Sequence, residues 1–167
     1  MNQYIRPIAI FRDYLPKVAD RLWKKYPNYE RPITSVDFIT EIAKDGRSQI
    51  MEGLIEISEV DRDVFISSME KFAENYSEIP YRTFIDEEYS NFSQKFKNSS
   101  GNLTNYLKYA HVLSLEQGKQ FVTCEEFLRA FFKSPPLEFI YFLEEEELLN
   151  VAVLNHYFKD IEGKFKK

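Results

Sequence analysis

One motif occurs twice in the chain at a constant offset, and this repeat constrains the fold more than any other feature. The first copy is ITSVDFITEIA, positions 33–43, and the second is VTCEEFLRAFF, positions 122–132, so the copies are 89 positions apart. Each runs through a β-branched residue, a threonine, a small residue, any residue, an acid, a phenylalanine and an aliphatic residue. Self-similarity at a fixed period is the mark of a repeat architecture. The sequence therefore predicts two related halves.

Each copy of the motif predicts the start of a helix. Thr34 and Thr123 are N-cap residues, whose hydroxyl accepts a hydrogen bond from a backbone N–H of the first turn. Glu126 follows Thr123 at the spacing of a capping box, and Asp37 is a shorter version after Thr34. The apolar residues that come next share one helical face in both copies: Phe38, Ile39 and Ile42 in the first, and Phe127, Leu128 and Phe131 in the second.

Helical periodicity continues along most of the chain, and evidence for strands is poor. We therefore predict an all-α fold in which two pseudo-symmetric repeats of four helices are preceded by an extra N-terminal helix. Pro7 would begin that extra helix. Tyr106 would lie at the opening of the second repeat. The predicted single domain, 1–167, divides into an extension (1–14), repeat one (15–73), a linker (74–104), repeat two (105–161) and a frayed tail (162–167).

Composition limits the classes of partner and compartment. The 27 acidic and 22 basic residues give a net charge of −5, which argues against binding to nucleic acid, because that requires a basic surface. The single cysteine, Cys124, excludes an intrachain disulfide and favours a reducing compartment. No signal peptide and no run of about 20 apolar residues is present. The expected location is the cytoplasm, with no membrane partner.

Catalytic and metal-binding patterns are missing from the sequence. His111 and His156 lack the spacing of metal ligands, so we predict no metal, no cofactor and no catalytic residue. Cys124 falls at a helix start, where a thiol pKa is lowered. Ser35 fills the matching position, which favours a structural role for a small residue. The acidic run 144–147 is interpreted as a solvated face, with recruitment of a basic partner as the alternative.

The segment AHVLSLEQGKQFVTCEEFLRAFFKSP, positions 110–135, resembles the repeat of the Clp N-terminal domain, found in Clp-type AAA+ unfoldases. Such domains have two repeats, and the resemblance covers about residues 14–161. It implies a module that binds substrates or adaptors for a hexameric ATPase and is itself a monomer. The chain has no GxxxxGK[ST] loop, so we expect no enzyme activity from this piece. Asp37-Phe38-Ile39 and Glu126-Phe127-Leu128 stand where family members often carry His-Leu-Leu.

The extension before the first repeat is most similar to the ClpV type, which disassembles the contractile sheaths of type VI secretion systems. That resemblance implies a groove for a helix of the sheath subunit or of an adaptor. Helical phase places the groove residues on two walls: Ile5, Ile8, Phe11 and Tyr14 on one, and Val18 and Leu22 on the other. The alternative is a free-standing all-α bacterial adaptor or immunity protein.

Overall fold

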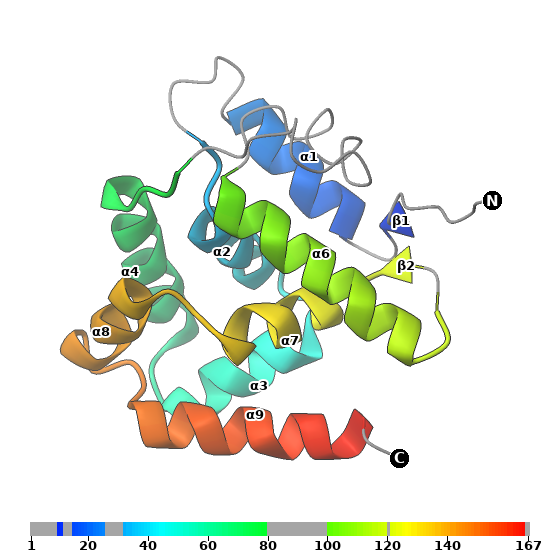
Figure 1. Ribbon diagram of the computed structural model, residues 1–167. Coiled ribbons are helices and arrows are strands. Elements are labelled where there is room, and N and C mark those ends of the chain that lie inside the picture. Colours follow the sequence, from blue (N-terminus) through cyan, green and yellow to red (C-terminus); the bar gives the residue numbers. More distant parts are fainter. Residues whose placement is uncertain (1–9, 12–14, 26–31, 80–99, 120, 166–167) are drawn as a thin grey trace.

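The protein is mostly helical, as a computed structural model shows (Figure 1). The structure describes residues 10–11, 15–25, 32–79, 100–119 and 121–165. The helices are α1 (Leu15–Lys25), α2 (Ser35–Asp45), α3 (Gln49–Ser58), α4 (Arg62–Asn75), α6 (Gly101–Glu116), α7 (Cys124–Lys133), α8 (Leu137–Glu145) and α9 (Val151–Phe165). Two short strands, β1 (Ile10–Phe11) and β2 (Phe121–Val122), pair in parallel. Within these ranges no helix has both the length and the apolar character needed to cross a bilayer.

Both predicted N-caps are present, and each belongs to a complete capping box. The Asp37 amide donates to Thr34 Oγ1 over 3.0 Å, and the Thr34 amide donates to Asp37 Oδ2 over 2.9 Å. In α7 the Thr123 amide donates to Glu126 Oε1 over 2.8 Å. Asp37 therefore completes its box despite its shorter side chain. Two backbone donors are satisfied at the start of each helix.

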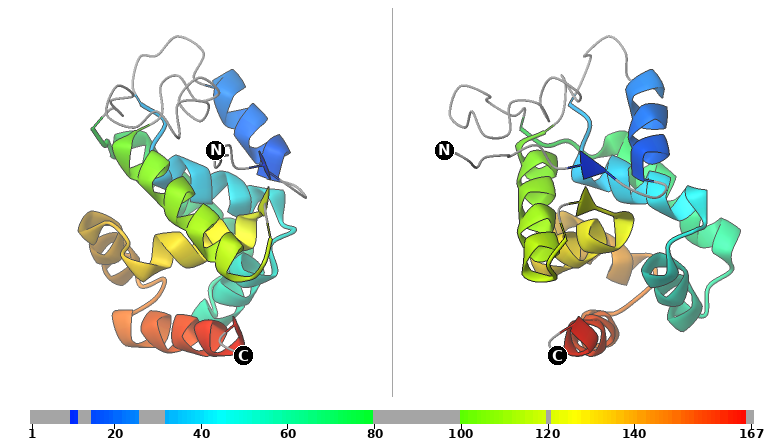
Figure 2. Two further views of the ribbon diagram at one scale, coloured as in Figure 1. Left: turned by 45° about the vertical axis from the view of Figure 1, so that its right-hand side comes forward. Right: turned by 90° about the vertical axis from the view of Figure 1, so that its right-hand side faces the viewer.

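The two repeated phenylalanines meet at the centre of the core. Phe38 of α2 and Phe127 of α7 are both fully buried, and their ring centroids are 4.5 Å apart. The other predicted core positions of the motif, Ile39, Ile42 and Leu128, are buried as well. Figure 1 shows α6 in front of α2, and Figures 1 and 2 both show α1 toward the top of the molecule and α9 at the bottom. The repeated motif thus supplies the two central helices of the molecule.

Two backbone contacts cross between the sequence halves. In the β1–β2 pair, Phe11 is matched with Val122. At the opposite side of the core, the Ser100 amide donates to the Ile33 carbonyl over 2.9 Å. In each contact, the segment before one helix lies against the segment before a central helix of the other half. These two contacts connect the first half of the sequence to the second through the backbone.

The prediction of a helix near the N-terminus is wrong at residues 10–11, which form strand β1. An extended backbone lets these residues bond to β2, and the aliphatic and aromatic side chains of this stretch suit a strand. The remaining residues of the predicted extra helix lie outside the described part of the chain.

The second half differs from the prediction at the start of α6 and at the end of α9. Helix α6 begins at Gly101, earlier than the predicted opening near Tyr106, because the Ser100 hydroxyl accepts from the Leu103 amide over 2.9 Å and caps it. Helix α9 begins at Val151 and continues to Phe165, through most of the tail predicted to fray. A short polar cap in loop-like sequence marks the start of α6, and contacts of Glu162 and Phe165 with Arg129 of α7 accompany the longer α9.

Candidate functional site

A groove between α4 and α8 is the best candidate for a binding site in the described part of the chain. It encloses about 510 Å³, and Figure 1 shows the two helices side by side at the left of the molecule. Its lining comes from α4 and the residue after it (Ser68, Lys71, Phe72, Asn75, Tyr76) and from α8 and the residue after it (Glu138, Tyr141, Phe142, Glu145, Glu146).

Stacked aromatic rings form the floor of this groove. The Phe72 ring of α4 lies 4.6 Å from Phe142 of α8 and 5.1 Å from Tyr76, with stacked geometry in both pairs. The Phe139 ring packs edge-on against Phe72, with the ring centroids 5.9 Å apart. Such pairs add about 0.5–1.5 kcal/mol beyond the burial of their surface. The floor is therefore an apolar platform of packed aromatic rings.

The rim of the groove combines one exposed aromatic side chain with exposed acidic side chains. Tyr141 is 58% exposed although it is a large aromatic residue. Glu138, Glu145 and Glu146 are exposed beside it, whereas Lys71 of α4 is the cation among the lining residues. An apolar floor with a charged rim is the usual construction of a protein-binding surface.

One end of the groove is fixed to the core through a carboxylate. The Tyr76 hydroxyl donates to Glu78 Oε2 over 2.7 Å. Glu78 also accepts from the Ser35 amide and hydroxyl and from the Ser100 hydroxyl, over 2.6–2.8 Å. Burial raises the pKa of Tyr76 well above its usual range, and the bond to Glu78 raises it further. Glu78 thus joins the groove to the starts of α2 and α6.

Of the six residues predicted to line a groove, only Val18 and Leu22 have described side chains, so the predicted groove stays a prediction. Val18 and Leu22 are fully buried, because the apolar stripe of α1 packs against α2. Phe11 lies in β1, where only its backbone is described. The other three predicted residues, Ile5, Ile8 and Tyr14, lie outside the described residues. In this structure, neither Val18 nor Leu22 is exposed to a partner.

Sequence reasoning missed the α4–α8 groove, although one signal for it was present. The stretch LEFIYFLEE of α8 carries more large apolar residues than a single buried helical face requires. Leu137 and Tyr141 are the surplus, and they are 64% and 58% exposed. Periodicity shows that a surplus exists, but not which neighbouring helix lies beside it.

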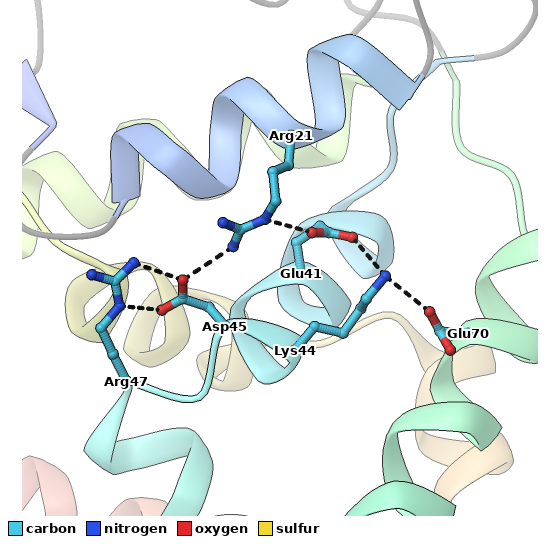
Figure 3. A network of polar contacts seen from close by, with 6 residues as sticks. All are labelled: Arg21, Glu41, Lys44, Asp45, Arg47 and Glu70. Atoms are coloured by element: carbon cyan, nitrogen blue, oxygen red, sulfur yellow. Dashed lines mark hydrogen bonds and ion pairs between the residues drawn. The ribbon is translucent and has the colours of Figure 1, made fainter.

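A cluster of charged side chains connects α1, α2 and α4 through ion pairs (Figure 3). Arg21 of α1 pairs with Glu41 and Asp45 of α2, each over 3.1 Å. Lys44 of α2 pairs with Glu70 of α4 over 3.0 Å. These ion pairs tie three helices together.

The pKa values of two groups in this cluster reflect their partners. Hydrogen bonds from Arg47, and then from Arg21, hold the pKa of Asp45 below its usual value against the opposing effect of burial. The bond to Glu70 raises the pKa of Lys44. Opposite charges favour the ionised form of each group.

The residues considered for chemistry in the sequence are dispersed. Cys124 is fully buried at the start of α7. His111 is buried in α6, whereas His156 is exposed on α9 beside Asp160. Among the described residues, no group of three or more histidine, cysteine, aspartate or glutamate side chains is arranged to hold a metal ion.

Comparison of the sequence with models of known protein families gives no match, and comparison with curated proteins gives none either.

Proposed function

We propose that this chain is a protein-binding module with the two-repeat architecture of the Clp N-terminal domain. Repeat one would consist of α1–α4 and repeat two of α6–α9. The helix starts support this assignment, because α2 and α7 begin 89 positions apart, as do α4 and α9. The offset equals that of the repeated sequence motif.

The observation that carries the proposal is the pairing of the crossing segments. Ile33 and Val122 are 89 positions apart, and so are Phe11 and Ser100. The contact of Phe11 with Val122 therefore has a counterpart in the contact of Ser100 with Ile33. A pseudo-twofold axis exchanges such pairs, and the contact between Phe38 and Phe127 would lie close to it.

The activity that we propose is capture of a helix from another protein. The α4–α8 groove provides an aromatic floor and an exposed Tyr141, and helix-in-groove binding needs such an apolar channel. In a ClpV-type unfoldase the captured helix would come from the sheath subunit of a type VI secretion system. Display on a hexameric ring would strengthen weak single contacts through multivalency.

Binding of a fluorescent peptide from the N-terminal helix of a contractile-sheath subunit tests this function. We expect saturable binding to the wild-type protein, measured by fluorescence anisotropy. Binding should weaken in Tyr141→Ser if the α4–α8 groove is the site and in Phe11→Glu if the N-terminal segment is the site. Failure of the folded wild type to bind would contradict sheath recognition.

A second candidate is a free-standing adaptor or immunity protein that binds a basic partner. The exposure of all four glutamates in the run 144–147 favours it. Sequencing of the reading frame beyond codon 167 distinguishes the two candidates. A downstream GxxxxGK[ST] loop would support the unfoldase, whereas a stop codon would support the free-standing protein.

A further inference from the structure

The acidic end of α8 lies between two hollows of the surface. One is the α4–α8 groove, to which Glu145 and Glu146 contribute. The other encloses about 370 Å³ and is lined by Ile57, Ser58, Glu144, Glu147, Leu148, Leu149, Asn150 and Val153. Four consecutive glutamates are thus divided between two hollows. We call the run 144–147 the acidic ridge.

Each hollow presents exposed apolar side chains next to the acidic ridge. Tyr141 lines the α4–α8 groove and is 58% exposed, and Ile57 and Val153 line the second hollow at 38% each. Tyr141 and Glu145 are four positions apart in α8, so about 6 Å of helix separates them at 1.5 Å per residue, and Glu147 lies in the turn that follows. A single partner helix of about four turns, roughly 20 Å long, can reach both hollows.

The charges around these hollows are unbalanced. Glu138, Glu145, Glu146 and Glu147 form no ion pair within the described part of the chain. Among the described residues that line either hollow, Lys71 is the one cation. An uncompensated acidic rim repels nucleic acid and acidic helices, and it attracts a chain with lysine or arginine beside its apolar face.

We propose that the partner is a basic amphipathic helix that lies along α8, with apolar side chains in both hollows and basic side chains against Glu138 and the acidic ridge. This inference rests on the proposed function, helix capture, and it specifies the chemistry of the captured helix. The aromatic floor supplies contact area, and the rim supplies orientation and selectivity.

Three synthetic peptides of about 18 residues provide the test, since that length spans both hollows. The first has Leu and Phe on one helical face and Lys on the other. The second replaces each Lys with Glu. The third keeps the composition of the first in a scrambled order without an apolar face. Fluorescence anisotropy gives each dissociation constant at about 50 and 300 mM NaCl, on either side of strong screening.

We expect the basic amphipathic peptide to bind saturably, with the acidic and scrambled peptides at least about tenfold weaker. Higher salt should weaken the binding of the basic peptide and leave the ranking of the three affinities unchanged. Charge reversal in Glu138→Lys/Glu145→Lys should weaken the binding of the basic peptide about tenfold. Tyr141→Ser and Val153→Ser should each weaken it several-fold, one for each hollow.

Matched controls lie on other helices. Asp20→Lys on α1 reverses an exposed charge, and Leu115→Ser on α6 removes a side chain that is 52% exposed. Neither should change the affinity by more than about twofold, because both lie away from α8 (Figure 1).

The outcomes separate this inference from the proposed function. Equal binding of the basic and acidic amphipathic peptides, unaffected by charge reversal on α8, would overturn the inference and leave helix capture intact. An unchanged affinity in both Tyr141→Ser and Val153→Ser would place the site elsewhere and also overturn it. If no peptide binds, including the sheath peptide, both proposals fail.

Discussion

At the scale of single residues, the centre of the core depends on Phe38 and Phe127. Both are fully buried and their rings are in contact. We expect each change to Ala to lower the free energy of unfolding by about 3–5 kcal/mol. The double substitution should show a coupling of about 0.5–1.5 kcal/mol, because each ring loses the same partner.

Urea unfolding followed by circular dichroism measures these losses. Leu115→Ala is the control, because that side chain is exposed, and its effect should stay within about 0.5 kcal/mol. Losses well below about 1 kcal/mol at both phenylalanines would mean that the repeated motif does not build a shared core.

At the scale of elements, the packing of α9 on α3 requires a glycine. A Cβ on Gly53 of α3 would collide with the Tyr157 hydroxyl of α9, which donates to the Ile50 carbonyl over 2.7 Å. Gly53→Ala should therefore lower the free energy of unfolding by about 1–3 kcal/mol, despite the better helix propensity of Ala. Thermal unfolding measures the change.

Gly163 of α9 is the matched control, because a Cβ there meets nothing within 4 Å. Gly163→Ala should raise the free energy of unfolding by up to about 1 kcal/mol. Tyr157→Phe in the Gly53→Ala background should recover part of the loss by removing the hydroxyl that collides. A stabilising effect of Gly53→Ala would show that a Cβ fits between α3 and α9 and would contradict this prediction.

Asp45, at the end of α2, makes the stability depend on pH through its ion pairs with Arg47 and Arg21. The folded pKa of Asp45 lies below its ordinary value of 3.8, mainly through Arg47. Its contribution is therefore complete above that value and is lost as the pH falls through the folded pKa. Arg47→Gln should raise the folded pKa and flatten the rise of stability with pH in this acid range. Carboxyl NMR titration and unfolding at a series of pH values measure both effects, and an unchanged profile would contradict the assignment.

Local signals in the sequence predicted the helices and their caps well. The capping boxes at Thr34 and Thr123 and the buried face of each central helix are fixed by neighbours within one or two turns, which a sequence displays directly. Gly46 ends α2 with a positive φ of 81°, a backbone conformation that favours glycine.

The errors fall where distant residues decide the structure. Ile10 and Phe11 form a strand because β2, more than one hundred positions away, supplies the partner. Helix α9 continues through the predicted tail, where Arg129 of α7 binds Glu162 over 2.7 Å and stacks 4.0 Å from the Phe165 ring. The groove was missed for the same reason, since it depends on α4 lying beside α8.

At the scale of the whole molecule, side-chain hydrogen bonds connect the two sequence halves. The Ser48 hydroxyl before α3 donates to Glu125 of α7 over 2.6 Å, and the Ile50 amide donates to the same carboxylate over 3.1 Å. Tyr157 of α9 adds the bond to Ile50. Together with the crossing segments, these bonds join α3 of the first half to α7 and α9 of the second.

We therefore expect a single unfolding transition, with α2 and α7 opening together. Native-state hydrogen exchange should give their most protected amides the same opening free energy, equal to the global value from denaturant unfolding. Phe38→Ala, although it lies in the first half, should lower the protection of α7 as much as that of α2. Two different opening free energies, with the loss confined to α2, would instead show two independent half-domains, because each half would then keep its fold without the other.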